Sequence, residues 1–228
     1  MADVRKDGLV GYWKFDEGQG TTAHDSSGNG NDGTLLPAIS GPLWVDGKSG
    51  YALAFDGIAR NVSIPDSPSI NITGNQLTLS AWIFPYGQAN TAKFVYKSND
   101  NEPTGYGFGY QQDTTFPSTV SFFVGNGTNS WISAASNYFA NCFNPIPLNS
   151  WSSVVGVANP GILKIYINGN LCNSTVYSGS IQSNDFQLNI GGHRFSITNN
   201  QHFNGTIDET RIYNKALAPD DLINLKAI

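Results

Sequence analysis

The chain has 228 residues, a formal net charge of −5 and only 13% charged residues. This length is enough for one large β domain with its own core. The negative charge argues against binding to nucleic acid or to an anionic membrane surface, because neither exchanges counterions for acidic side chains. No apolar run approaches the roughly 18 residues that span a bilayer. Asn, Ser, Thr, Gly and Gln must cover most of the surface, which favours an extracellular β protein over a cytosolic enzyme.

The first half of the chain predicts strands separated by turn residues. Loosely alternating apolar side chains predict a strand over residues 9–15, which ends at the turn Asp16-Glu17-Gly18. An oxygen-rich loop with three glycines follows, from His24 to Thr34. A long connection, 37–50, has Trp44 and Val45 as its apolar anchors. Further strands are predicted at 51–55, 61–65, 77–84 and 93–97.

The second half continues the strand pattern and closes with a helix. Tyr106, Phe108 and Tyr110 alternate with glycines, so they share one face of a strand. Residues 120–124 and 131–135 predict a hairpin, and the clearest pair is 151–158 with 162–167. Asn168-Gly169 predicts the next tight turn, and strands at 186–190 and 205–213 complete the set. Pro219 and two acidic residues at the start of 218–225 predict a short helix.

About a dozen short strands and one terminal helix predict an all-β fold, an antiparallel two-sheet sandwich. The pattern shows no internal repeat, no low-complexity linker and no second domain. We expect residues 1–8 to form an N-terminal extension and residues 9–228 to form a single domain.

Cysteines and glycosylation motifs bear on the location of the protein. Residues 1–8 contain no apolar segment, so no signal peptide is expected, and a cytosolic location is the simplest alternative. We favour a domain from a longer secreted or cell-surface chain. Cys142 and Cys172 are an even pair that allows one disulfide. Five Asn-x-Ser/Thr motifs also suit secretion: Asn61, Asn71, Asn126, Asn173 and Asn204.

Four blocks of the chain together resemble a known family. They are Leu9-Val-Gly-Tyr-Trp-Lys-Phe-Asp-Glu-Gly18 with Asp25-Ser-Ser-Gly-Asn-Gly-Asn-Asp-Gly33, Leu77-Thr-Leu-Ser-Ala-Trp82, Trp151 to Val157 continued by Leu163 to Gly169, and Phe203 to Leu217. Their order is similar to that of laminin-G-like, concanavalin A-like jelly-roll domains. The resemblance implies two antiparallel sheets, one of them concave, with ligands at the concave face or its rim. It also implies binding to sugars, proteins or lipids, although the superfamily includes glycoside hydrolases and lyases.

The loop 24–34 is a candidate structural calcium site. Asp25, Ser27 and Asn29 are spaced by two with Gly30 after them, which matches the first half of an EF-hand loop. Leu36 stands where that loop needs a bidentate Glu, so a second carboxylate must come from elsewhere. The resemblance places the closing strand beside the loop. We therefore predict Ca²⁺ ligands from this set, with Asp16 in reserve: Asp25, Gly30, Thr34 and Asp208. The alternative is a metal-free loop held by Asx-turns and by N–H bonds to Asp25.

Aromatic and polar side chains in the middle of the chain are candidates for sugar binding. Trp13, Trp82 and Trp151 lie in alternating apolar runs, and we assign them to the core. Aromatic residues in polar, glycine-rich surroundings are better candidates for stacking, although packing in the core or at the rim is an equally good interpretation of each one. The predicted ligand-binding residues are Trp44, Asn101, Glu102, Tyr106, Tyr110, Trp131, His193 and Arg194, with Tyr138, Asn99 and Asp100 as secondary candidates. His193 has no partner at metal-ligand spacing, which argues against zinc.

Catalysis is not predicted. Glycoside hydrolysis normally needs two carboxylates that face one cleft, and the catalytic relatives carry them on one strand as Glu-x-Asp-x-x-Glu. The chain has only Glu17, Glu102 and Glu209, and two of these lie in the opening and closing blocks. His193 beside Arg194 is too unspecific to indicate lyase chemistry.

A Cys142–Cys172 disulfide would join the insertion 137–148 to the neighbouring hairpin. Closing a loop of about 30 residues contributes about 3–4 kcal/mol in the chain-entropy model. Two buried free thiols are the alternative.

The sequence thus predicts a non-catalytic, lectin-like, calcium-stabilised module that binds a carbohydrate or a surface glycoconjugate and does not insert into membranes. An adhesion or structural domain with protein partners is the alternative, and a polysaccharide-active enzyme is the less favoured third.

Overall fold

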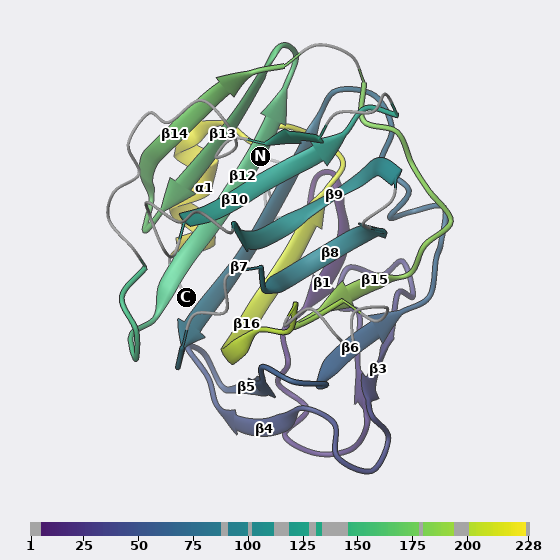
Figure 1. Cartoon of the computed structure of the whole chain (residues 1–228), viewed down its shortest axis with the longest axis vertical. Helices are drawn as coiled ribbons and strands as arrows, with labels where there is room; N and C mark the ends of the chain where they lie inside the picture. The colour runs from purple at the N-terminus through teal and green to yellow at the C-terminus, as the bar shows by residue number, and fades with distance from the viewer. Residues whose placement is uncertain are drawn as a thin grey trace.

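The computed structural model describes residues 6–87, 91–99, 102–111, 119–127, 131–133, 146–177, 180–193 and 201–226. Two eight-stranded antiparallel sheets pack face to face (Figure 1). Sheet A has the order β14-β13-β12-β7-β16-β5-β4, with β1 also paired to β16, and sheet B has the order β11-β10-β9-β8-β15-β6-β3-β2. The predicted antiparallel jelly-roll sandwich is confirmed.

The strands of sheet A come from both ends and the middle of the chain: β1 (Leu9–Trp13), β4 (Leu43–Asp46), β5 (Tyr51–Asp56), β7 (Leu77–Pro85), β12 (Ser152–Asn159), β13 (Ile162–Ile167), β14 (Asn170–Val176) and β16 (Asn204–Tyr213). Sheet B contains β2 (Thr22–Ala23), β3 (Gly33–Leu36), β6 (Asn61–Ile64), β8 (Lys93–Asn99), β9 (Glu102–Gln111), β10 (Thr119–Gly125), β11 (Trp131–Ser133) and β15 (Leu188–Ile190). The predicted pairs β10–β11 and β12–β13 form. The turn between β13 and β14 has φ values of 51° at Asn168 and 81° at Gly169, as a tight hairpin turn requires.

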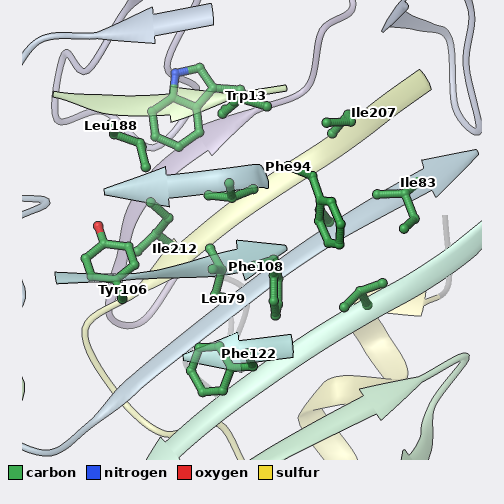
Figure 2. Close-up of a cluster of buried hydrophobic side chains, with 14 of the residues drawn as sticks. Trp13, Leu79, Ile83, Phe94, Tyr106, Phe108, Phe122, Leu188, Ile207 and Ile212 are labelled. Carbon is green, nitrogen blue, oxygen red and sulfur yellow. The ribbon is translucent and has the colours of Figure 1, made fainter. Parts of the chain in front are cut away.

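The main core lies between the two sheets. Strand β7 shows how the period of two builds it, because Leu77, Leu79, Ala81 and Ile83 all face inward. Figure 2 shows Leu79 and Ile83 of sheet A meeting aromatic rings of sheet B, among them Phe94, Phe108 and Phe122. The side chains between them in sequence point to the outer face of sheet A.

A second, smaller core covers half of that outer face. The helix α1 (Pro219–Lys226) follows β16 directly and lies behind sheet A in Figure 1. Leu222 and Leu225 of α1 pack with Leu217 against outward side chains of β12, β13 and β16, which are Val155, Val157, Tyr166 and Tyr213. None of the helices in the described part of the chain is long and apolar enough to cross a membrane.

Strand β16 changes partners along its length. Residues 204–207 pair with β5, and residues 210–213 pair with β1. Between them the register against β7 shifts from Asp208 to Arg211, and Glu209 has a φ of 51°. Such a bulge re-aims side chains. Two acidic residues therefore lie where β5 and β1 meet along the closing strand.

Candidate functional site

The carboxylate of Asp25 holds the opening loop together. Its Oδ1 accepts hydrogen bonds from the amides of Tyr12 and Ser27, both at 2.9 Å. Its Oδ2 accepts from the hydroxyl of Ser27 at 2.8 Å and from the amide of Asn31 at 2.9 Å. Four donors thus surround the two oxygens, as in the metal-free alternative considered for this loop. Asp25 has little capacity left for a cation.

The carboxylate of Asp208 is only half satisfied. The side chain is fully buried, and Oδ2 accepts hydrogen bonds from the amides of Lys48 at 2.9 Å and Ser49 at 3.1 Å. Oδ1 is buried without a hydrogen-bond partner among the described residues. Burial raises the pKa of Asp208 to about 7, while the amide of Ser49 opposes this shift. A proton, a water molecule or a cation would satisfy Oδ1.

The turn between β4 and β5 lies between two carboxylates. It is closed by a 2.9 Å hydrogen bond from the amide of Gly47 to the carbonyl of Gly50. Asp208 binds this turn on one side, and Asp16 accepts a hydrogen bond from the amide of Tyr51 at 3.1 Å. Asp16, the reserve ligand, therefore lies at the same turn as Asp208.

The predicted ligand set does not gather in one place. Thr34 is exposed on β3 in sheet B, whereas Asp208 lies on β16 in sheet A, and Gly30 is exposed in the loop. Among the described residues, no hydrogen bond joins Asp25 to Asp208, and no three His, Cys, Asp or Glu side chains are clustered so that they could hold a metal ion. A cation at Asp208 would need backbone and amide oxygens for most of its shell.

Tyr12 joins the opening and closing segments instead. Its amide donates to Asp25, and its hydroxyl donates to Glu209 Oε2 at 2.6 Å. Arg211 donates to the Tyr12 hydroxyl at 2.7 Å, forms an ion pair with Glu209, and lies 4.2 Å from the Tyr12 ring centroid. Burial raises the pKa of Tyr12 well above its usual value. The two ends of the sandwich are thus connected by protein side chains.

Two predicted ligand-binding tyrosines are core residues. Tyr106 and Tyr110 are 1% and 2% exposed, and the Tyr106 hydroxyl donates to the buried carbonyl of Ile70 at 2.9 Å. Figure 2 shows the Tyr106 ring within the core cluster. The alternating glycines face outward, where a Cβ on Gly107 would lie 2.8 Å from the ring of Phe123. The expectation of exposed tyrosine faces on β9 is therefore wrong.

His193 and Trp44 differ in accessibility. His193 is 2% exposed and packs edge-on against Tyr96, with ring centroids 4.8 Å apart, so it does not reach an exposed rim as expected. Trp44 is half-buried against the core, and its Nε1 donates to the carbonyl of Gly20 at 3.0 Å. Of the predicted aromatic residues whose side chains the structure describes, Trp44 is the partly exposed one.

Several candidates fall outside the described residues. These are Asn101, Arg194, Asp100, Tyr138 and Cys142, together with the side chains of Asn99, Glu102 and Trp131. Cys172 is half-buried against the core. The Cys142–Cys172 disulfide stays a prediction.

The motif asparagines are not equally accessible. Asn61 and Asn173 are buried, and Asn61 donates to Asn189 at 3.1 Å. These two positions do not offer an accessible glycosylation site on the folded chain, so they weaken the sequence argument for secretion.

Three aromatic residues on the outer face of sheet A were not predicted as a site. Trp13 lies in the main core as expected. Trp82 is buried, but it lies on the outer face and belongs to neither core cluster. Trp151 is partly exposed and contacts the ring of Phe84 rather than the main core. Tyr86, next to Phe84 in space, is 45% exposed. The alternation in β7 contains the signal, because inward Leu79, Ala81 and Ile83 require outward Trp82 and Phe84.

Comparison with known proteins places the fold. The model of the concanavalin A-like lectin/glucanases superfamily, Laminin_G_3, matches residues 56–222. Domain 4 of AbnA, an extracellular GH43 arabinanase from Geobacillus stearothermophilus solved with arabinotriose, superposes with a TM-score of 0.71 at 23% identity, covering 96% of this chain and 98% of that one.

Two toxin domains are also similar to this chain. The binding domain of Paraclostridial Mosquitocidal Protein 1 gives a TM-score of 0.73 at 20% identity over 97% of this chain and 52% of that one. Botulinum neurotoxin type C depends on two ganglioside molecules for cell entry. Its structure gives a TM-score of 0.66 at 17% identity, over 97% of this chain and 51% of that one. This chain thus spans about half of each toxin domain. With the sandwich, the strand order and the family match in agreement, the chain belongs to the concanavalin A-like lectin/glucanase superfamily.

Proposed function

We propose that this chain is a non-catalytic carbohydrate-binding module of a secreted or cell-surface protein. The strongest support is its end-to-end likeness to a domain solved with arabinotriose, since 96% of this chain and 98% of that domain superpose. The surface chemistry agrees, because 13% charged residues leave amides and hydroxyls to cover most of the exterior. These groups form hydrogen bonds with sugar hydroxyls.

Two of the three glutamates have structural partners. Glu209 is buried between Tyr12 and Arg211, and Glu17 Oε1 accepts a hydrogen bond from the amide of His24 at 2.7 Å. A glycosidase needs a pair of acidic groups free to act on one bond. Glu17 Oε2 is buried without a partner among the described residues. The engagement of Glu209 by Tyr12 and Arg211 is therefore the stronger support for binding without hydrolysis.

The proposal includes a structural calcium ion at Asp208, with Asp25 removed from the ligand set. Asp208 fits a cation because one carboxylate oxygen is buried without a partner among the described residues. Ca²⁺ would supply the positive charge that this oxygen lacks, and carbonyls of the turn after β4 and the Asp16 carboxylate are the nearby oxygen donors. Its role would be to stabilise the junction of β16 with β4 and β5.

A glycan array probed with the full chain, in calcium and in EDTA, tests the function. We expect binding to one class of oligosaccharide, with arabinotriose and ganglioside headgroups as the first probes for calorimetry. The readout must include a hydrolysis assay by chromatography of the same probes. Binding without cleavage supports the proposal. Cleavage would make the protein an enzyme, and silence across the array would favour the adhesion domain with protein partners.

A further inference from the structure

The outer face of sheet A has one covered half and one open half. The half near Thr78 and Ser80 lies under α1 and its leucines. The other half carries one row of side chains across neighbouring strands, from Phe84 on β7 through Thr206 on β16 and Ala54 on β5 to Leu43 on β4. Trp151, just before β12, extends this row because its ring meets Phe84.

We define the aromatic platform as Phe84 and Trp151 of this row together with Tyr86, which follows Phe84 by two residues. The ring of Phe84 contacts both others edge to face, with centroids 5.7 Å from Tyr86 and 5.5 Å from Trp151. The Tyr86 hydroxyl forms a 2.7 Å hydrogen bond with Thr206 Oγ1, and the Tyr86 amide donates to the carbonyl of Asn204. The platform is therefore held in place before any ligand arrives, which lowers the entropic cost of binding.

Polar groups border the platform on both sides. Asn149 and Ser150 are exposed immediately before Trp151, and the Asn149 amide donates to the carbonyl of Pro85 at 2.8 Å. On the other side, Asn204 Nδ2 lies 3.1 Å from where a Cβ on Gly87 would be. Exposed aromatic surface with a polar border is typical of binding sites. The amides and hydroxyls match sugar hydroxyls.

Trp82, in the neighbouring row of side chains on β7, forms the edge of the platform. Trp82 lies next to Phe84 on the same face but is buried, and the Lys48 ammonium lies 4.8 Å from its ring centroid. That ring face is already occupied. No Lys, Arg, Asp or Glu belongs to the platform or to the row of described residues from Phe84 to Leu43. In the row of Tyr86, Asp56 lies opposite Asn204 and forms an ion pair with Arg60. A neutral ligand therefore suits the platform better than an acidic one.

We propose that the aromatic platform binds a neutral oligosaccharide, with the C–H face of a sugar ring stacked on Trp151 and Tyr86 and its hydroxyls bound by Asn149 and Asn204. This inference rests on the proposed function and specifies where it takes place. A protein interface is less suitable, because stable ones bury about 800 Å² on each partner, far more than three rings offer.

Calorimetry with arabinotriose and the best neutral glycan of the array tests the platform. Trp151→Ala and Tyr86→Ala should each weaken binding by about tenfold or more, since buried aromatic anchors dominate such contacts. Tyr86→Phe, which keeps the ring, should retain most of the affinity. The matched control is Tyr51→Ala, because Tyr51 is 47% exposed and lies outside the platform. Melting curves must show that every variant is folded.

NMR of the indole N–H signals provides a readout that does not depend on folding of the variants. The glycan should shift the Trp151 signal and leave the buried Trp13 signal in place. If the wild type binds a glycan while both alanine variants keep its affinity and the Trp151 signal does not move, the platform is not the site and the proposed function stands. If the wild type binds no glycan, both proposals fail. Binding of acidic glycans alone would also overturn the platform proposal.

Discussion

Asp25 and Asp208 are the two carboxylates predicted to share one cation, and the structure gives them opposite environments. Asp25 lies in a partly exposed loop and accepts four hydrogen bonds, three of them from donors within six residues in sequence. Asp208 is fully buried and binds two amides about 160 residues away, with Oδ1 left unpartnered among the described residues. The loop around Asp25 is complete without a cation, whereas the site around Asp208 is not.

This difference shows that a segment rich in oxygen-bearing side chains does not, for that reason alone, need a cation. A loop with donors at nearly every step satisfies its own carboxylate, so a dense run of Asp, Ser and Asn indicates an Asx-type turn as readily as a metal site. A buried carboxylate on a strand has few local donors, because the backbone N–H groups around it pair in the sheet. The buried environment of Asp208 therefore predicts the need for a cation better than its sequence motif does.

The largest expected effect is on Asp25. Asp25→Ala leaves four donors without their acceptor, and we expect a loss of about 4 kcal/mol in the free energy of unfolding. Denaturant titration in EDTA measures it, so that calcium plays no part. Ser27→Ala, which removes only one of the four donors, should cost about 1 kcal/mol. Equal losses for the two variants would contradict the central role of Asp25.

The second prediction concerns the pH dependence of Asp208 without calcium. Its folded pKa is about 7, above the usual value of 3.8, so the folded chain binds the proton more tightly. Below about pH 3 both states are protonated and Asp208 costs nothing. As pH rises to about 7, the unfolded state ionises first and stability is lost, up to about 4 kcal/mol.

The variant Asp208→Asn removes the ionisable group and so isolates the pH-dependent loss of stability caused by Asp208. In EDTA it should match the wild type near about pH 3 and become the more stable of the two by about pH 8, as measured by paired melting curves. A gap that does not change with pH would show that Oδ1 already has a partner.

The third prediction is that calcium raises the melting temperature of the wild type and leaves that of Asp208→Asn unchanged. At about 100 times its dissociation constant, an ion bound to the folded state adds about 2.7 kcal/mol. For a chain of this size the melting temperature should rise by about 5–10 °C. Asp25→Asn serves as the matched control and should keep the calcium shift. Loss of the shift in Asp25→Asn, with retention in Asp208→Asn, would restore the opening loop as the metal site.

The sequence was informative where the physics is local. Alternation at period two located β7, β12 and β13, and Asn168-Gly169 marked a real turn, because these signals depend on neighbouring residues. Three of the four donors to Asp25 lie in the same loop, and the metal-free alternative followed from it directly. The short strands β2, β3 and β4 carry too few residues to show a period.

The candidate site was harder to predict because its contacts are long-range. Alternation put Tyr106 and Tyr110 on one face of β9 but could not say whether that face meets the core. Trp151 resembles a core residue in sequence, yet it lies before β12, beyond the part of the face that α1 covers. The pairing of Asp208 with Lys48 and Ser49 depends on the order of strands in sheet A, and no local pattern encodes that order.

The smallest expected effect concerns Tyr12, which connects the two regions. Its amide belongs to the Asp25 loop, and its hydroxyl belongs to the closing strand through Glu209 and Arg211. Tyr12→Phe keeps the amide and the ring but removes the hydroxyl, so we expect a loss of about 1 kcal/mol, because Glu209 and Arg211 retain each other as partners. Asp25 and Tyr12 are joined by a hydrogen bond, and contacting residues often show coupled losses. We expect the Asp25→Ala and Tyr12→Phe losses to be additive all the same, because the first removes the acceptor of the Tyr12 amide and the second removes only the Tyr12 hydroxyl. A double variant measured by denaturant titration checks this. Strong coupling between the two would mean that the opening loop and the closing strand act as one unit, and the contrast between Asp25 and Asp208 would then describe two parts of a single structure rather than two independent sites.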